Sequence, residues 1–183
     1  MKMGPFAMEI ESLRKGPISF DVDEPVESLD LVDILGFVFD DRVAGRLEYR
    51  LVGDDVLIRG RLRAHAVGQC VRCLEAAPCA IDVEVGLAFF KGPAPEEQEC
   101  DDADIEGAIV DYYDGDQIDP MPQLRDLILL ELPDLPKCSG DCKGLCAQCG
   151  GNLNEGPCQC SSKADASDAN GWKSQLRQLR LDN

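Results

Sequence analysis

The sequence contains no run of eighteen apolar residues, which predicts that no helix spans a membrane. Its first residues, MKMGPFAMEIESLRKGP, include no continuous apolar segment, so we expect no secretory signal peptide. Basic residues are scarce: 18 Lys and Arg stand against 35 Asp and Glu, which gives a net charge of −17. A chain this acidic does not attract nucleic acid through its overall field, and any RNA contact requires a local basic patch.

Signatures of catalysis are missing as well. The sequence has a single histidine, His65, and no G-x-S-x-G motif, P-loop, G-x-G-x-x-G motif or catalytic-triad order. His65 follows Arg63 at a strand-like spacing of two residues, which predicts a surface side chain rather than a general base. The sequence therefore predicts a protein that is not an enzyme and has no small-molecule substrate.

Cysteine is what the sequence has in excess, with ten residues in 183. Without a signal peptide we expect the chain in a reducing cytoplasm, where disulfides do not persist and clustered cysteines are usually metal ligands. Six of them lie in CSGDCKGLCAQCGGNLNEGPCQC, residues 138–160, and a C-x2-C pair lies upstream. The predicted ligands are Cys70, Cys73, Cys138, Cys142, Cys146, Cys149, Cys158 and Cys160.

These eight cysteines suit one or two structural zinc ions, because a tetrahedral site of four thiolates is closed and leaves no position for a substrate. The sequence does not assign the pairing. One division joins Cys70 and Cys73 to two cysteines of the later segment and completes a second site around Cys146 and Cys149; a single site with spare thiols is the alternative. The spacing of these cysteines matches neither ferredoxin pattern, which argues against an iron–sulfur cluster. No βαβ pattern surrounds either C-x2-C pair, which argues against a redox-active dithiol. Cys79 and Cys100 are expected to be incidental.

Alternating hydrophobicity predicts most of the strands. Residues 46–52 and 56–64 alternate on either side of a Gly-Asp turn, which predicts a β-hairpin, and residues 81–89 predict a third strand after a loop at 70–79. Residues 18–22 predict an edge strand and 109–113 a short strand. If Gly53 and Asp54 form the turn, Tyr49 faces Ile58, Leu51 faces Val56 and Glu48 faces Arg59.

A helix is predicted after Asp119, a capping residue, with Pro120 at its first position and Leu124, Leu127 and Ile128 on one face. The fold class is α+β: an antiparallel sheet packed by a helix, a cysteine-rich zinc-binding segment and a terminal helix. We expect a sheet-and-helix domain at 1–136 with an acidic loop at 92–104, a zinc-binding segment at 137–160 docked on it, and a linker with an amphipathic helix at 161–183.

Arginines recur at every second residue of the second hairpin strand, about 6.6 Å apart, a spacing comparable with that of phosphates along a nucleic-acid strand. The alternative is a solvated outer face paired with Glu48, Asp82 and Glu84. The acidic loop favours a basic protein, such as a ribosomal protein, as partner. The candidate RNA- or partner-binding residues are Arg46, Arg50, Arg59, Arg61, Arg63, Arg72, Lys173, Arg177 and Arg180.

The motifs CVRCLE at 70–75, ILLELP at 128–133, CKGLCAQCGGNLN at 142–154 and the final CQC resemble the YceD family, bacterial and plastid proteins described as large ribosomal RNA subunit accumulation proteins. Ala147 stands where the family usually has proline, and residues 168–172 depart from its DPR-type segment. The resemblance implies a cytoplasmic, non-enzymatic factor for accumulation or processing of 23S ribosomal RNA. Its partner would be large-subunit precursor rRNA or a basic ribosomal protein, and its zinc would be architectural.

Two further functions are compatible with the residues. Thiols in excess of four are compatible with a zinc- or redox-sensing regulatory adaptor, which would expose rapidly reactive cysteines. A metal-dependent hydrolase would require an open coordination position, which a site of four thiolates does not provide. We therefore take the assembly factor as the leading hypothesis and the sensor as its alternative.

Overall fold

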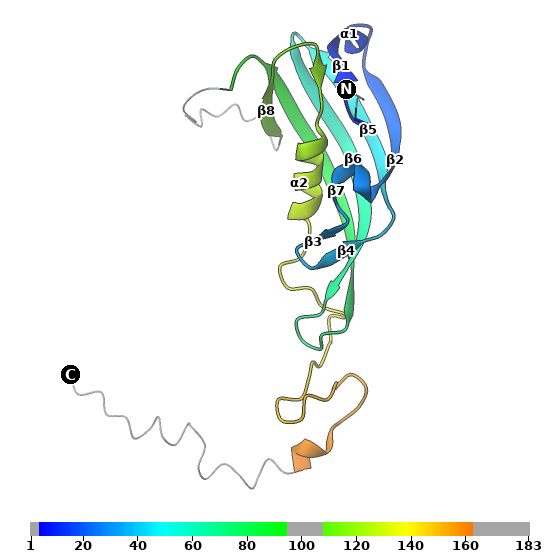
Figure 1. Cartoon of the computed structure of the whole chain (residues 1–183), viewed down its shortest axis with the longest axis vertical. Helices are drawn as coiled ribbons and strands as arrows, with labels where there is room; N and C mark the ends of the chain where they lie inside the picture. The colour runs from blue at the N-terminus through cyan, green and yellow to red at the C-terminus, as the bar shows by residue number, and fades with distance from the viewer. Residues whose placement is uncertain (1–3, 95–107, 163–183) are drawn as a thin grey trace, which may run out of the picture.

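A computed structural model describes residues 4–94 and 108–162 of the chain. One twisted sheet of seven strands is the main feature of the described residues, with a helix against one face and the cysteine-rich segment beyond one end (Figure 1). The elements are β1 (Met8–Glu9), α1 (Ile10–Leu13), β2 (Ile18–Pro25), the 3-10 helix η1 (Val26–Leu29), β3 (Asp33–Ile34), β4 (Phe37–Phe39), β5 (Arg42–Val52), β6 (Asp55–Gln69), β7 (Ala76–Lys91), β8 (Ile109–Tyr113), β9 (Gln117–Ile118), α2 (Met121–Leu130) and the 3-10 helix η2 (Gln159–Ser162).

The predicted hairpin is confirmed in its register. β5 and β6 pair antiparallel around a turn at Gly53 and Asp54, and the partners are Tyr49 with Ile58, Leu51 with Val56, and Glu48 with Arg59. This register follows from the period of two, because a slip of one residue would turn every apolar side chain of the strand to solvent. Among the described strands, β2 pairs only with β5 and is therefore an edge strand of the sheet, as expected.

The sheet is mixed rather than antiparallel. β8 forms the expected short strand, but it runs parallel to β7, with Leu87 opposite Ile109. The chain leaves β7 and passes through residues outside the described ranges before β8, and a connection of that length can return to run in the same direction. The expectation of a purely antiparallel sheet was therefore wrong at this edge, while the α+β class holds.

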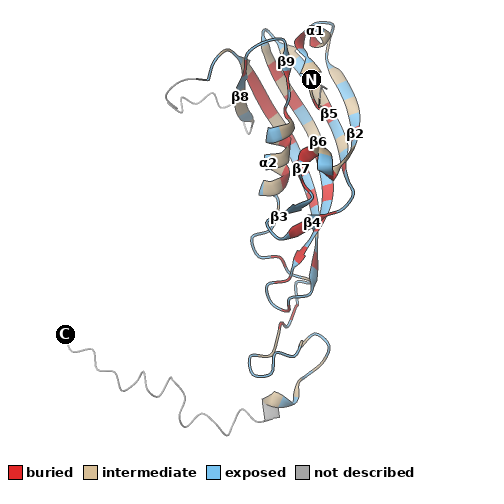
Figure 2. Cartoon of the chain, in the orientation of Figure 1, coloured by how far each residue is buried: buried red, intermediate tan, exposed pale blue. Residues whose placement is uncertain are grey.

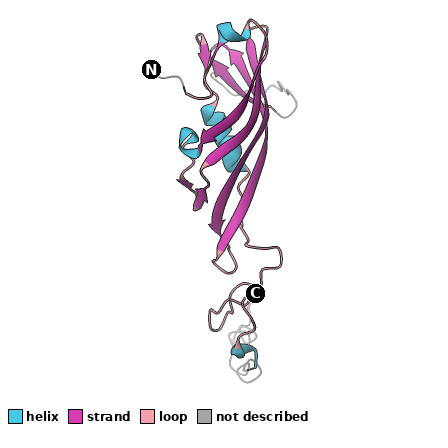
Figure 3. Cartoon of the chain, turned by 90° about the vertical axis from the view of Figure 1, so that its right-hand side faces the viewer, coloured by secondary structure: helices cyan, strands magenta, loops and turns pink. Residues whose placement is uncertain are grey.

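β6 and β7 form the longest described hairpin, and the cysteine-rich segment lies at its tip (Figure 3). Its strands extend to Gln69 and restart at Ala76, so the connecting turn is Cys70 to Glu75, shorter than the predicted loop at 70–79. Cys79 consequently lies within β7 rather than at the end of the loop. Pairing continues through Val67 and Pro78, because proline still contributes a carbonyl and a φ compatible with a strand.

One face of the sheet builds the core, and α2 covers it. Buried and exposed residues alternate along β6 and β7 (Figure 2), and Leu124 and Ile128 of α2 are fully buried in the same cluster as Ile58 and Leu62. The Asp119 carboxylate accepts a hydrogen bond from the Met121 amide at 3.1 Å, as a helix cap does. α2 begins at Met121, so Pro120 precedes the helix instead of occupying its first position.

Three sequence predictions fall outside the described residues: the acidic loop beyond Ala94, Cys100, and the terminal segment with Lys173, Arg177 and Arg180. Within the described ranges, no helix is both long and apolar enough to cross a membrane.

Candidate metal centres

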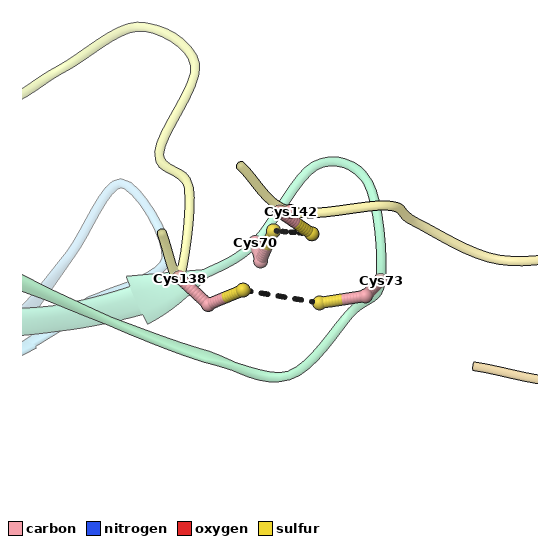
Figure 4. A group of neighbouring side chains, drawn as sticks. All are labelled: Cys70, Cys73, Cys138 and Cys142. Carbon is pink, nitrogen blue, oxygen red and sulfur yellow. Dashed lines mark hydrogen bonds between the residues drawn. The ribbon is translucent and has the colours of Figure 1, made fainter. Parts of the chain in front are cut away.

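The first group of cysteines joins the tip of the β6–β7 hairpin to the segment that follows α2. Cys70, Cys73, Cys138 and Cys142 place their sulfurs within 4.8 Å of one another (Figure 4). The Sγ atoms of Cys70 and Cys142 are 3.8 Å apart, and those of Cys73 and Cys138 are 3.5 Å apart. Sulfurs held about 2.3 Å from one tetrahedral cation lie about 3.8 Å apart. The group therefore has the donor set and the spacing of a four-cysteine metal site.

The second group lies entirely within the later segment. Cys146, Cys149, Cys158 and Cys160 also bring their sulfurs within 4.8 Å of one another. The two groups differ in burial: Cys70, Cys73 and Cys142 are at most 3 % exposed, whereas Cys149 is exposed and its three companions are partly so. All eight predicted ligands are thus assembled in two sets of four, which is the division that joins Cys70 and Cys73 to the later segment.

The two C-x2-C pairs share one backbone design. In each, the amide after the second cysteine donates to the carbonyl of the first: Leu74 to Cys70 at 2.9 Å, and Gly150 to Cys146 at 2.8 Å. Both donor residues adopt the left-handed backbone conformation, with φ of 65° for Leu74 and 70° for Gly150. This turn lets backbone N–H groups point at sulfur, which compensates part of the negative charge that four thiolates place around one cation.

Hydrogen bonds reinforce the attachment of the later segment to the hairpin tip. The Val71 amide donates to the Pro136 carbonyl, and the Leu145 amide donates to the Arg72 carbonyl, both at 3.0 Å. Asn154 donates its side-chain amide to the Cys142 sulfur at 3.4 Å and accepts from the Lys143 amide at 2.7 Å. Asn154 was not among the predicted site residues, although it is the last residue of the NLN sequence in the recognised motif.

The pKa values of the thiols differ widely, as expected for neighbouring groups that repel one another when all of them are ionised. The backbone N–H of Cys138 lowers the pKa of Cys70 to about 6, and that of Cys149 lowers the pKa of Cys146 to about 6. The pKa of Cys160 is raised to about 12 by its hydrogen bond with the Cys149 thiol and by burial. A divalent cation among the sulfurs removes this conflict, because it stabilises all four as thiolates.

The remaining described cysteine stands apart from both groups. Cys79 lies in β7, and its thiol donates to the Ala77 carbonyl at 3.4 Å. Among the described residues no cysteine forms a disulfide. His65 is exposed on β6, on the face opposite the core. Neither residue belongs to a described metal group.

The predicted arginines form a charged outer face of the sheet, and most of them pair with carboxylates. Arg46 pairs with Asp21 at 3.2 Å and Arg50 with Glu48 at 3.0 Å. Asp82 receives two arginines, Arg61 at 3.5 Å and Arg63 at 3.2 Å. These exposed pairs leave the arginines hydrated and available for exchange, because such pairs contribute only about 0–1 kcal/mol each.

Arg59 differs from its neighbours. It faces Glu48 on one side, whose carboxylate is engaged by Arg50, and Gly86 on the other, which has no side chain. Within residues 4–94 and 108–162 it forms no ion pair. Arg72 is exposed at the hairpin tip beside the first cysteine group.

Comparisons with known proteins agree with the resemblance in the motifs. The family model described as "Large ribosomal RNA subunit accumulation protein YceD" matches residues 58–180. An uncharacterized protein of Mycobacterium tuberculosis is 32% identical over 157 residues, covering 84% of this chain and 73% of its own length. A Zea mays protein named "Large ribosomal RNA subunit accumulation protein YCED homolog 1, chloroplastic" is 31% identical over 188 residues, covering 86% of this chain and 64% of its own. No solved structure matches.

Proposed function

Since this chain belongs to the YceD family, we propose that it is a non-enzymatic factor for accumulation and processing of the large-subunit ribosomal RNA, 23S rRNA in bacteria. The match to the family over residues 58–180, with the maize relative whose name states rRNA accumulation, carries the proposal. Its site of action would be the cytoplasm, where the eight clustered thiols stay reduced.

We assign both cysteine groups to structural Zn2+. Four sulfur donors at tetrahedral spacing are typical of closed zinc sites and leave no open position for a substrate, which supports a role in folding rather than in catalysis. The first site would fasten the later segment to the β6–β7 hairpin, and the second would organise the segment itself. Each would supply the stability that residues 137–160 cannot obtain from an apolar core.

The RNA partner would meet the outer face of the sheet at Arg59. This guanidinium has no described carboxylate partner, so binding a phosphate breaks no ion pair, whereas Arg61 must first leave Asp82. We expect Arg59→Glu to weaken binding to a precursor rRNA fragment at least as much as Arg61→Glu does. Filter binding at several salt concentrations measures both variants, and Arg14→Glu, on α1's C-terminal side, serves as a control. Equal binding by all variants would remove the outer face from the proposal.

Depletion in the native organism tests the function itself. Loss of the protein is expected to reduce mature 23S rRNA and free large subunits relative to small ones, as measured by RNA quantification and sucrose gradients. The wild-type chain should restore them, and a chain carrying Cys70→Ser should not. Unchanged 23S rRNA and large subunits after depletion would refute the proposed function.

The exposure of the second cysteine group favours one alternative, a zinc- or redox-sensing adaptor. A sensor should expose thiols that react rapidly with a maleimide or a disulfide reagent while the metal is bound. Titration of the metal-loaded protein distinguishes the two functions, because saturated structural sites protect all eight thiols. Rapid reaction of the four thiols of the second group would favour the sensor.

A further inference from the structure

A hollow of about 630 Å³ lies beside the second cysteine group. Ala147, Leu153 and Pro157 line it together with cysteines of the group, and Lys143 is the only charged side chain among the described residues of its lining. Its volume is within the range of binding pockets, about 300–1,000 Å³. An apolar hollow of this size in a segment without a core of its own is suited to receive a large apolar side chain.

The chain itself supplies a candidate for that side chain. Cys160 lines the hollow and η2 ends at Ser162, so the chain leaves the described structure next to the hollow. The sequence beyond carries Trp172, Leu176 and Leu179 at i, i+4 and i+7, which in a helix share one face. Trp172 is the only tryptophan of the chain. The family model also continues to residue 180, so this segment belongs to the unit that the family model describes.

We propose that residues 171–181 dock as a helix into this hollow, with the face of Trp172 against Ala147, Leu153 and Pro157. The intervening residues 163–171 span up to about 30 Å when extended, far more than the return to Cys160 requires. A tether this short holds the segment near its site at millimolar effective concentration. Docking within one chain is therefore favoured over docking of a second copy at micromolar protein.

Docking would also create a basic surface on a chain of net charge −17. Lys173, Arg177 and Arg180 follow the apolar residues by one position each, about 100° around a helix, so in a docked helix they would flank the hollow on the solvent side. The second metal site would thus hold a row of cations at the far end of the molecule from the sheet (Figure 1). The use of this row of cations to bind phosphate rests on the proposed function, whereas the docking itself does not.

Fluorescence of the single tryptophan tests the docking in the full, metal-loaded chain. We expect blue-shifted emission and severalfold weaker acrylamide quenching than in a synthetic peptide of residues 163–183. Ala147→Glu places a carboxylate in the hollow at an exposed position and is expected to restore the emission and quenching of the peptide. Ala80→Glu, exposed on β7 and outside the hollow, is the matched control and should leave the emission unchanged. Circular dichroism and zinc content verify that both variants fold.

Three outcomes would overturn the inference. The first is wild-type emission equal to that of the peptide, which places Trp172 in solvent. The second is shielding that grows with protein concentration, which assigns the hollow to a second copy. The third is shielding that survives in Ala147→Glu, which places the segment elsewhere. A shielded Trp172 together with unchanged 23S rRNA after depletion would leave the docking intact and refute only the proposed function.

Discussion

At the scale of single residues, Tyr49 shows how the core accommodates a polar group. Its side chain is fully buried in β5, and its hydroxyl donates to the Phe6 carbonyl at 3.0 Å, which ties the N-terminal segment to the sheet. Burial, and after it the charge of Asp119, raises the pKa of the Tyr49 phenol well above its ordinary value of 10.0. The neutral phenol is the form that the fold requires.

This raised pKa predicts a stability loss in alkali. Because the folded pKa exceeds the unfolded value of 10.0, the contribution is fully present below pH 10 and is lost as the pH rises above it. Tyr49→Phe should cost about 1 kcal/mol at pH 7 through the orphaned Phe6 carbonyl, and should flatten the decline above pH 10. Urea unfolding at pH 7, 9 and 11 measures both effects. An identical alkaline decline in the variant would contradict the assignment.

A second residue-scale comparison concerns the two C-x2-C turns. Leu74 and Gly150 occupy the same left-handed position, but a leucine there costs about 1–2 kcal/mol that glycine does not. The turn at Cys70 to Glu75 tolerates this cost because the β6–β7 pairing and the first cysteine group constrain it from both sides. The turn at Cys146 is flanked by a single β-bridge, Leu145 with Asn152, instead of two long strands, and it carries glycine, which adopts this conformation freely.

At the scale of elements, β5 and β6 approach one another closely at two inward-facing glycines. A Cβ on Gly45 would lie 2.1 Å from the Arg61 carbonyl oxygen, and one on Gly60 would lie 2.1 Å from that of Arg46. Both obstacles are backbone atoms, which cannot move aside as a flexible side chain can. The close contact of the two strands therefore requires glycine at both positions.

Gly60→Ala should accordingly lower the free energy of unfolding by about 2–3 kcal/mol, the upper part of the range of about 1–3 kcal/mol for overpacked cores, because the atom it would meet is backbone. Gly53→Ala is the matched control, because its Cβ would meet no described atom within 4 Å and the change costs only the strain of a positive φ of 68°, about 1–2 kcal/mol. Thermal and urea unfolding measure the two variants. A smaller loss for Gly60→Ala than for Gly53→Ala would show that the strands separate easily.

The cysteine segment is the second element whose stability can be tested. Cys149→Ser removes a ligand of the second group and Cys70→Ser one of the first, so each is expected to lose one zinc. Cys149→Ser should expose the chain to proteases beyond Lys143 while the attachment at the hairpin tip persists. Cys70→Ser should release the segment from Lys137 onward. Native mass spectrometry and limited proteolysis measure these losses, and unchanged cleavage in both variants would contradict a structural role of the metal.

At the scale of the whole molecule, an apolar core stabilises one part of the chain and the two cysteine groups stabilise another. The sheet and α2 share one apolar cluster, whereas the later segment contributes mainly cysteines, glycines and polar residues. Cys70, Cys73, Ala77 and Cys142 form a separate small cluster at the junction. The molecule therefore has an apolar core at one end, and at the other a segment whose order depends on the cysteine groups (Figure 1).

Removal of the metal should disorder the cysteine-rich end of the molecule and leave the sheet folded. We expect elemental analysis of the reduced protein to find two zinc ions per chain. A chelator should remove the zinc of the exposed second group first, and removal of both should leave the far-UV signal of the sheet in place. Hydrogen exchange should then show lost protection at residues 137–162 and retained protection in β5 to β7. No bound metal in protein purified under reducing conditions would refute the zinc assignment.

Local pattern in the sequence determined much of this protein. The alternation of residues 46–64 around Gly53 and Asp54 was sufficient for the register of the hairpin, because side-chain period and turn length are properties of neighbouring residues. The spacing of Leu124 and Ile128 was likewise sufficient for a helix against the apolar face. The eight cysteine ligand candidates and the family could also be identified from the motifs alone.

Only the tertiary structure decided which groups meet across long sequence separations. The division of the cysteines depends on the path of the chain from α2 back to the hairpin tip, which brings Cys138 and Cys142 to Cys70 and Cys73. The parallel direction of β8 and the pairing of Asp82 with both Arg61 and Arg63 depend on the order of strands. Spacing along the chain limits which residues can meet. The packing of distant elements selects among the remaining arrangements, because the free energy of burial depends on the area that the assembled elements remove from water.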